Sequence, residues 1–324
     1  MKKKVSALIF NVFLICLSAG FIRSEDFSYR METFPYNQSF DSGTLYVVVS
    51  FDGCKELDKW QDIISFSKTN DIKFTFFISA VYFIPQADKT IYFNPVNPIQ
   101  EGVSNIGFGG TDQSVSQRKA YVLEAEALGS EIGSHLCGHF DAKTWDKEDW
   151  RIEFDEFAEI CSFLTVPVKS VRFPYLAMNK YVYPVMGLHG FTSIVSVDED
   201  EFDKYNRVTI NNEGENYSFL EFPMGSVQEG KSRVLMMDYN FFVHDKNNGV
   251  NPQDIEQKTI DTYLKEAASA FAHNRPLLIS HHFSVNDFDN AYWNAMKKSL
   301  LTLKEKYPVK FITVSELTRK CQSK

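Results

Sequence analysis

Two histidines, His135 and His139, stand four residues apart in the segment SHLCGH. Imidazoles at this spacing can converge on one metal ion, although such a pair is a weak signal in isolation. Other polar residues that could do chemistry stand at the ends of apolar, strand-like segments elsewhere in the chain: Asp52, Arg172, Asp238, His281 and His282. Polar groups at several strand ends are hard to explain as core packing, so the pattern favours a shared site.

The segments that would position these residues alternate between strand and helix patterns. Tyr46–Phe51 is a continuous apolar run with three valines, which is typical of a strand buried on both faces. We expect further strands at Lys73–Ser79, Glu131–His135, Ser170–Phe173, Phe191–Val197, Val234–Asp238, Pro276–His281 and Val309–Val314. We expect helices at Leu57–Lys68, Ser116–Leu128, Lys147–Leu164, Asp254–His273 and Ala291–Lys306.

This alternation predicts an α/β fold with a parallel sheet. We favour a distorted (β/α) barrel of about seven to eight parallel strands over an open doubly wound sheet, because a barrel gathers residues from strand ends at one mouth. The first expected helix is not preceded by a phosphate-binding glycine fingerprint, which weakens a nucleotide-binding alternative. The formal charge of −8 argues against electrostatic binding of nucleic acid.

The chain of 324 residues divides into three parts. Residues 1–24 have lysines, then an apolar run and then small residues, which predicts a secretory signal and export to the periplasm or the cell exterior. The run is too short for a permanent membrane span, and Ile15 before Cys16 disfavours lipidation. Residues 25–43 predict an N-terminal arm. Residues 44–324 predict a single catalytic domain with an inserted loop region at 80–115.

From about Tyr46 to Leu317 the sequence resembles the NodB-like polysaccharide deacetylases, which form carbohydrate esterase family four. Besides the histidine pair, the matching segments are Ser50–Gly53 (SFDG, where the family has SFDD or TFDD), Arg172–Tyr175 (RFPY), Leu277–His281 (LLISH) and Phe311–Leu317 (FITVSEL). The family's fourth motif is met only loosely, by Met237–Asn240. The resemblance implies a metal-dependent hydrolase that removes N-acetyl groups from an amino-sugar polymer, either peptidoglycan or a chitin-like glycan.

The resemblance also assigns roles. It implies one divalent metal ion, most plausibly Zn²⁺, held by His135, His139 and Asp52. Asp52 would take a proton from the attacking water, and Arg172 would hold that carboxylate. His281 would be the acid, oriented by Asp238, and the backbone N–H of Tyr175 would help to bind the oxyanion. Because neighbouring residues of a strand point to opposite faces, His282 is interpreted as a packed residue or as one that supports the site residues from behind, and not as the acid.

One departure from the family concerns the metal. Gly53 stands where the family has a second, metal-ligating aspartate. Asp52 is then the base, the metal ligand or both. Water or Asp58 could complete the set of metal ligands, although Asp58 is more simply a solvent-facing residue in the first turn of a helix. The departure motivates a second hypothesis, a carbohydrate-binding protein that has lost catalysis. A third is a deacylase or cyclic-amide hydrolase that acts on small molecules.

Aromatic residues make up 15% of the chain and fit either a core or a glycan groove. Candidates for stacking on sugar rings are Tyr82, Phe83, Tyr92, Phe108, Trp145 and Trp150, although the two tryptophans could equally pack a helix. Cys54 and Cys137 both adjoin site residues. They are either a disulfide or two buried thiols.

Overall fold

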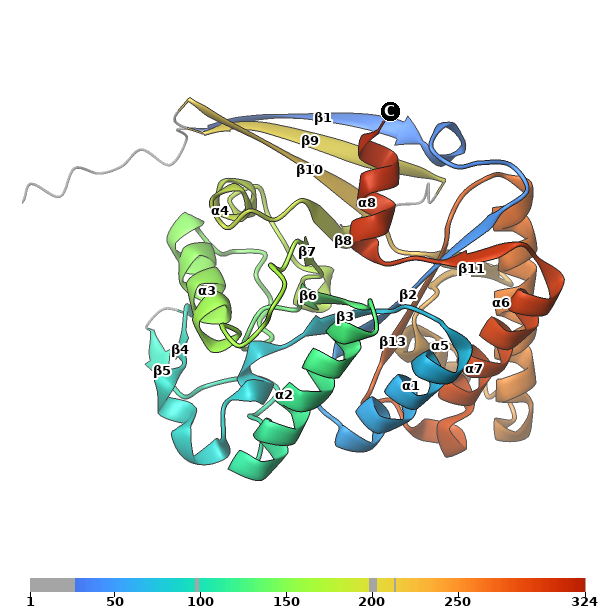
Figure 1. The fold of residues 1–324 in the computed structure, drawn as a ribbon, viewed down its shortest axis with the longest axis horizontal. Coiled ribbons are helices and arrows are strands. Elements are labelled where there is room, and N and C mark those ends of the chain that lie inside the picture. The colour runs from blue at the N-terminus through green and yellow to red at the C-terminus, as the bar shows by residue number, and fades with distance from the viewer. Residues whose placement is uncertain (1–26, 97–98, 198–202, 213, 324) are drawn as a thin grey trace, which may run out of the picture.

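A computed structural model describes residues 27–96, 99–197, 203–212 and 214–323 (Figure 1). The predicted secretory signal, residues 1–24, lies outside these ranges. A ten-stranded sheet runs through the centre, and its strands follow the order β1-β9-β10-β8-β7-β6-β3-β2-β13, with β14 also paired to β2. The predicted α/β fold with a parallel sheet is confirmed. No ladder among the described residues joins β13 back to β8 or β10, so the strand path is open at that side.

The parallel part of the sheet holds seven of the eight strands that the sequence predicts. They are β2 (Leu45–Gly53), β3 (Thr75–Ile78), β6 (Glu131–Ser134), β7 (Ser170–Val171), β8 (Ser193–Val197), β13 (Leu277–His282) and β14 (Val309–Phe311). The helices between them are α1 (Leu57–Asn70), α2 (Asp112–Ala127), α3 (Lys147–Ile160), α4 (Val182–Leu188), α6 (Ile255–Ala272) and α7 (Asp287–Lys306). The carboxyl ends of these parallel strands meet at one edge of the sheet, where the candidate residues lie.

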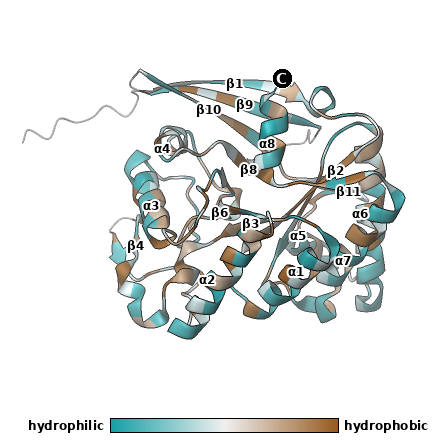
Figure 2. Ribbon diagram, viewed as in Figure 1, coloured by the Kyte–Doolittle hydropathy of each residue, from teal (hydrophilic) through white to brown (hydrophobic). Residues whose placement is uncertain are grey.

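Strand β2 is buried along nearly its whole length because it faces two cores. Val47, Val49 and Phe51 pack into the larger core, while Tyr46 and Val48 pack into the smaller one. This alternation is the two-residue period of a strand, and it explains why the segment is apolar at every position. In Figure 2 the central strands are accordingly brown, and teal gathers on the outward helices.

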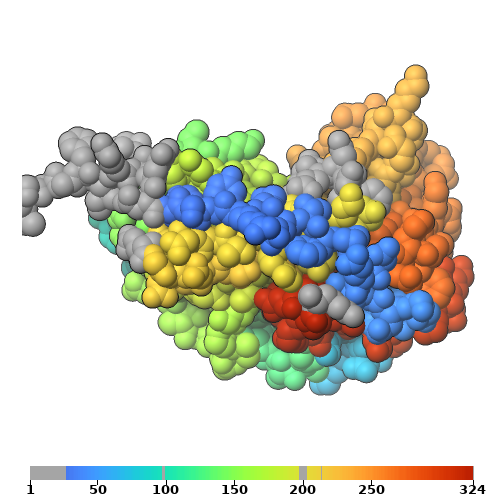
Figure 3. All heavy atoms as spheres, turned by 90° about the horizontal axis from the view of Figure 1, so that it is seen from above, coloured from blue at the N-terminus to red at the C-terminus, as the bar shows by residue number. Residues whose placement is uncertain are grey.

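The other part of the sheet was not predicted. Residues of the expected N-terminal arm form β1 (Phe27–Pro35), which pairs antiparallel with β9 (Lys204–Asn212). β9 in turn pairs antiparallel with β10 (Glu215–Pro223), which is parallel to β8. Figure 3 shows β1 in blue lying across the top of the molecule beside the yellow strands and the red C-terminal helix α8 (Val314–Gln322). The smaller core lies beneath this layer.

The remaining elements surround the sheet. The inserted region carries short turns and the two-stranded hairpin of β4 (Phe93–Asn94) and β5 (Gln100–Glu101). The hairpin β11 (Ser226–Glu229) and β12 (Ser232–Leu235) precedes α5 (Asp238–Asn247). The strand expected at Val234–Asp238 is wrong in its placement: β12 ends at Leu235 in a separate antiparallel hairpin, and Asp238 begins a helix. Within the described residues, no helix is both long and apolar enough to cross a membrane.

Candidate active site

The register between β2 and β13 decides which histidine of the doublet enters the site. His282 pairs with Asp52 across this parallel ladder, and His281 pairs with Phe51. Paired residues of parallel strands point to the same face of the sheet. His282 therefore lies on the face of Asp52, whereas His281 lies on the face of the aromatic core that contains Phe51.

Asp52 is held by a buried ion pair. Arg172 Nη1 donates a hydrogen bond of 2.9 Å to Asp52 Oδ1, and each side chain is only 2% exposed. Arg172 also donates from Nε to the carbonyl oxygen of Val195, and its guanidinium lies over the ring of Phe77. The structure thus brings together the two residues that the sequence analysis linked. Because the guanidinium is fixed from three sides, it holds the carboxylate in one orientation.

His282 is held by Asp238 in a similar way. Its Nδ1–H donates to Asp238 Oδ1 at 2.7 Å, and its backbone N–H donates to Oδ2 at 2.8 Å. Burial acts to lower the pKa of His282, but the charge and hydrogen bond of Asp238 outweigh it, so that the pKa is raised overall. For Asp238, burial acts to raise the pKa, and the two histidines lower it well below the usual range. His282 Nε2 is left facing Asp52, 4.0 Å from Oδ2.

His281 lies elsewhere, which corrects the expected orientation of the doublet. Its side chain is fully buried, and its Nε2 is hydrogen-bonded to the hydroxyl of Tyr263 at 2.9 Å. Its Nδ1 lies 3.4 Å from Asp238 Oδ2, on the buried side of that carboxylate. The prediction placed His281 in the site and His282 in the packing or behind the site residues. The structure places them the other way round, because the register puts His281 beside Phe51.

The histidine pair lies at the end of β6. His135 is 3% exposed and donates from Nδ1 to the carbonyl oxygen of Arg172 at 2.7 Å, which leaves Nε2 as its lone-pair nitrogen. The rings of His135 and His139 have centroids 5.2 Å apart. Burial lowers the pKa of His135 to about 3 and also lowers that of His139. Both rings are therefore neutral near pH 7, as metal ligands must be.

These two imidazoles fit part of the predicted metal site. Nδ1 of His139 is buried without a hydrogen-bond partner, and His135 is oriented by a carbonyl as metal-binding histidines commonly are. No third histidine, cysteine or carboxylate joins them as a ligand cluster among the described residues. Asp52, His135 and His139 therefore do not form the predicted three-ligand set, and Asp52 is paired through Oδ1 with Arg172. Asp58, the other candidate, is exposed in the first turn of α1.

The backbone at Gly53 bears on why this chain lacks the second aspartate of the family motif. Its φ of +78° lies in the left-handed region, which favours glycine. A Cβ added there would come no closer than 3.6 Å to Tyr82 Cε2. The position therefore has room for a side chain but has a backbone conformation that disfavours one.

Two exposed tyrosines flank the site. Tyr175 is 60% exposed, has a φ of +56°, and lies edge-on to His139 with ring centroids 4.7 Å apart. Tyr239 is 54% exposed and lies edge-on to His282, with centroids 6.2 Å apart. The aromatic residues proposed from the sequence to stack on sugars are instead all buried: Tyr82, Phe83, Tyr92, Phe108, Trp145 and Trp150. They belong to the core.

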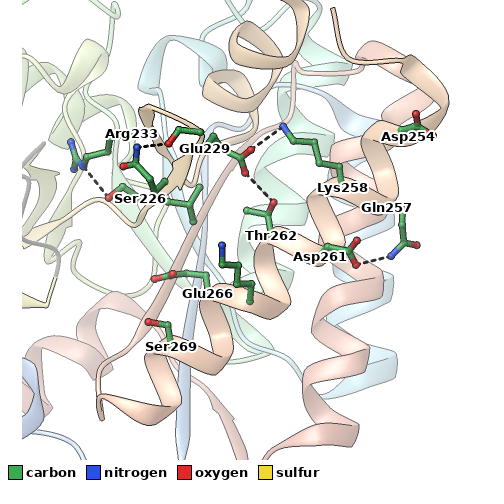
Figure 4. Close-up of a pocket in the computed structure, with 14 residues that line it drawn as sticks. Ser226, Glu229, Arg233, Asp254, Gln257, Lys258, Asp261, Thr262, Glu266 and Ser269 are labelled. Carbon is green, nitrogen blue, oxygen red and sulfur yellow. Dashed lines mark hydrogen bonds and ion pairs between the residues drawn. The ribbon is translucent and has the colours of Figure 1, made fainter. Parts of the chain in front are cut away.

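The cysteines and the cleft shown in Figure 4 are separate from this chemistry. Cys54 and Cys137 are buried free thiols, so the disulfide alternative is not realised.

The cleft, of about 1100 Å³, lies between the β11–β12 hairpin and α6, and Figure 4 shows Glu229 reaching Lys258 and Thr262 across it. None of the described residues that line it is aromatic or belongs to the candidate site.

Comparisons with known proteins bear on the family. Residues 41–194 match the family model for polysaccharide deacetylase. This segment belongs to the polysaccharide deacetylase family. The match confirms the predicted resemblance and the predicted enzyme class, and it covers Asp52, the histidine pair and Arg172. Asp238 and His282 lie beyond it. The comparison with curated proteins found no match.

Several solved structures are similar to this chain, and the first of the three that follow supports the fold. A protein from Mycobacterium smegmatis described as a polysaccharide deacetylase is 12% identical, with a TM-score of 0.58, and the alignment covers 87% of this chain and 92% of that one. The chitin deacetylase of Colletotrichum lindemuthianum is 15% identical, with a TM-score of 0.49 and coverages of 84% and 86%. A family-four pseudoenzyme from Bacillus anthracis is 11% identical, with a TM-score of 0.47 and coverages of 86% and 66%.

Proposed function

We propose that this chain is an exported polysaccharide deacetylase, a hydrolase that removes N-acetyl groups from an amino-sugar polymer, either peptidoglycan or a chitin-like glycan. One observation carries the proposal. Asp52 and His282 face one another on the same rung of the β2–β13 ladder, and each is held by a buried partner of opposite charge. A fixed carboxylate opposite a fixed imidazole is the acid–base pair that amide hydrolysis needs.

The residues of the pair have complementary tasks. Asp52 accepts the proton of the attacking water, while Arg172 keeps the carboxylate oriented. His282 donates a proton to the departing nitrogen from Nε2. Asp238 keeps Nδ1 of that ring protonated and raises its pKa, so that the ring carries a proton to donate near neutral pH. The backbone N–H of Tyr175 is proposed to donate to the oxyanion, as the family resemblance implies.

The histidine pair is proposed to hold a divalent ion, with zinc the most plausible. When bound there, such an ion would polarise the acetyl carbonyl and acidify the attacking water. His135 and His139 supply two neutral nitrogen donors for it, and the remaining positions have no protein carboxylate among the described residues. A calorimetric titration of the protein with zinc measures how many ions the chain binds and with what affinity.

The exposed tyrosines are proposed to hold the glycan. Tyrosine rings beside the reacting groups can pack against the apolar faces of pyranose rings. We expect Tyr239→Ala to raise KM about three- to tenfold with kcat nearly unchanged. Tyr29→Ala is the matched control, because Tyr29 is similarly exposed but lies on the edge strand β1. Equal effects of the two substitutions would refute this placement.

Acetate release from peptidoglycan, chitin oligomers and an N-acetylated exopolysaccharide, measured side by side, tests the activity and the substrate. Asp52→Asn should abolish release, whereas Asp58→Asn, in the exposed first turn of α1, should leave it unchanged. Unchanged release in Asp52→Asn would refute the proposed reaction. The missing carboxylate at Gly53 favours one alternative, a carbohydrate-binding protein without catalysis, for which glycan binding without acetate release is the expected result.

A further inference from the structure

The turn that carries His139 has an unusual backbone. Leu136 and His139 both have positive φ, +58° and +60°, in the left-handed region that most L-residues avoid. Such conformations persist only where surrounding contacts determine them. The contacts that determine this turn therefore also determine where the ring of His139 points.

Glu153, on helix α3, supplies the contacts on one side. Its carboxylate is fully buried, and Oε1 accepts the backbone N–H groups of Cys137 at 2.8 Å and of Gly138 at 3.0 Å. Its Oε2 accepts the hydroxyl of Tyr92, in the inserted region, at 2.7 Å. One carboxylate thus satisfies both N–H groups between the two left-handed residues.

The inserted region supplies the contacts on the other side. The backbone N–H of Asn105 donates to the carbonyl oxygen of Gly138, and its side-chain amide donates to that of His139, each at 2.9 Å. Gly138 itself is tightly enclosed, because an added Cβ would lie 2.2 Å from Phe140 Cε2 and 2.5 Å from the hydroxyl of Tyr92. The turn is therefore fixed from both sides, by a buried carboxylate on one and by a neutral amide on the other.

We propose that Glu153 is a positioning residue that sets the direction of the His139 ring. It touches neither substrate nor the reacting atoms in this arrangement, and it acts through the N–H groups of Cys137 and Gly138. The proposal rests on the proposed metal role of the histidine pair. It adds a residue of α3 that no motif contains and assigns a purpose to a carboxylate buried in an otherwise apolar helix face.

The substitution Glu153→Gln tests this proposal. A glutamine side chain keeps the shape, but it carries no charge and has one acceptor oxygen, so it cannot accept from the hydroxyl of Tyr92 and from the two N–H groups at the same time. We expect the imidazole ¹⁵N and ¹H resonances of His139 in the metal-free protein to shift. We expect zinc affinity to fall about 10- to 100-fold, the usual effect of losing an outer-shell partner. The matched control is Glu159→Gln, on the exposed face of the same helix.

The outcomes separate this proposal from the proposed function. Unchanged His139 resonances together with unchanged zinc affinity in Glu153→Gln would overturn it. Shifted resonances in a protein that never releases acetate would refute the reaction and leave the positioning role intact. If Glu153→Gln does not fold, Tyr92→Phe removes one hydrogen bond of the carboxylate and keeps the ring. That variant must then shift the His139 resonances, and resonances identical to wild type would overturn the proposal.

Discussion

The histidine doublet at the end of β13 allows the same substitution at two adjacent positions that the structure places in opposite environments. His282→Gln removes the imidazole that faces Asp52. His281→Gln removes the imidazole that is bonded to Tyr263 in the core. If His282 is the acid, the first substitution should reduce kcat and the second should reduce stability.

The expected magnitudes follow from these contacts. A positioned general acid contributes about 10²- to 10⁴-fold to the rate, so His282→Gln should raise the barrier by about 3–5 kcal/mol. Its cost in folding stability should be small, about 1–2 kcal/mol, because Asp238 still accepts hydrogen bonds from the backbone N–H groups of residue 282 and of Tyr239. His281→Gln leaves the buried phenol of Tyr263 without its partner, which should cost about 1–3 kcal/mol of stability.

Two measurements separate the effects. Initial rates of acetate release at saturating substrate and pH 7 give kcat, and urea unfolding of the same preparations gives the free energy of unfolding. We expect His281→Gln to keep kcat within about threefold of wild type once the folded fraction is taken into account. A loss of more than about 100-fold in His281→Gln, with near-normal kcat in His282→Gln, would show that the register argument assigns the wrong histidine.

Three further predictions concern the neighbours of this pair. Asp238→Asn should lower the pKa of His282 and move the basic limb of the pH–rate profile to lower pH by about 1–3 units, whereas an unmoved limb would contradict the role of Asp238. Arg172→Met should cost about 3–5 kcal/mol in urea unfolding because it leaves the charge of Asp52 buried without a partner, and a cost below about 1 kcal/mol would contradict that account. Gly53→Asp should raise zinc affinity at least about tenfold in calorimetry, because it restores a carboxylate. It should also cost about 1–2 kcal/mol of stability, because an L-residue is strained at this positive φ. Unchanged affinity would show that the position does not face the ion.

The parallel half of the sheet could be predicted from the sequence because its strands are buried on both faces and are therefore apolar at nearly every position. β2 is the clearest case. β1 could not be predicted, because it is an edge strand whose side chains are mostly exposed, so its residues show no apolar pattern. Its pairing with β9 also joins segments that are far apart in the chain, and no local signal specifies such a pairing.

The same distinction explains which site residues were found. Asp52, Arg172 and His135 stand at or beside the ends of predicted strands, so their proximity follows from a parallel sheet. The choice between His281 and His282 depends on the register of two strands that are far apart in sequence, and that register is fixed by packing. Glu153 left a weaker sequence signal, a carboxylate three residues after Trp150 on the apolar face of a helix.

The rung formed by Asp52 and His282 also means that the proposed catalytic unit is larger than the family match. The proposed base, its arginine and the histidine pair lie within residues 41–194, but His282 and Asp238 come from beyond them. β2 is the strand that connects the two parts, since it pairs with β3 on the matched side and with β13 on the other. If His282 is the acid, the chain matches the family through its proposed base and its histidines but depends, for proton donation to the leaving group, on a strand that the match does not include.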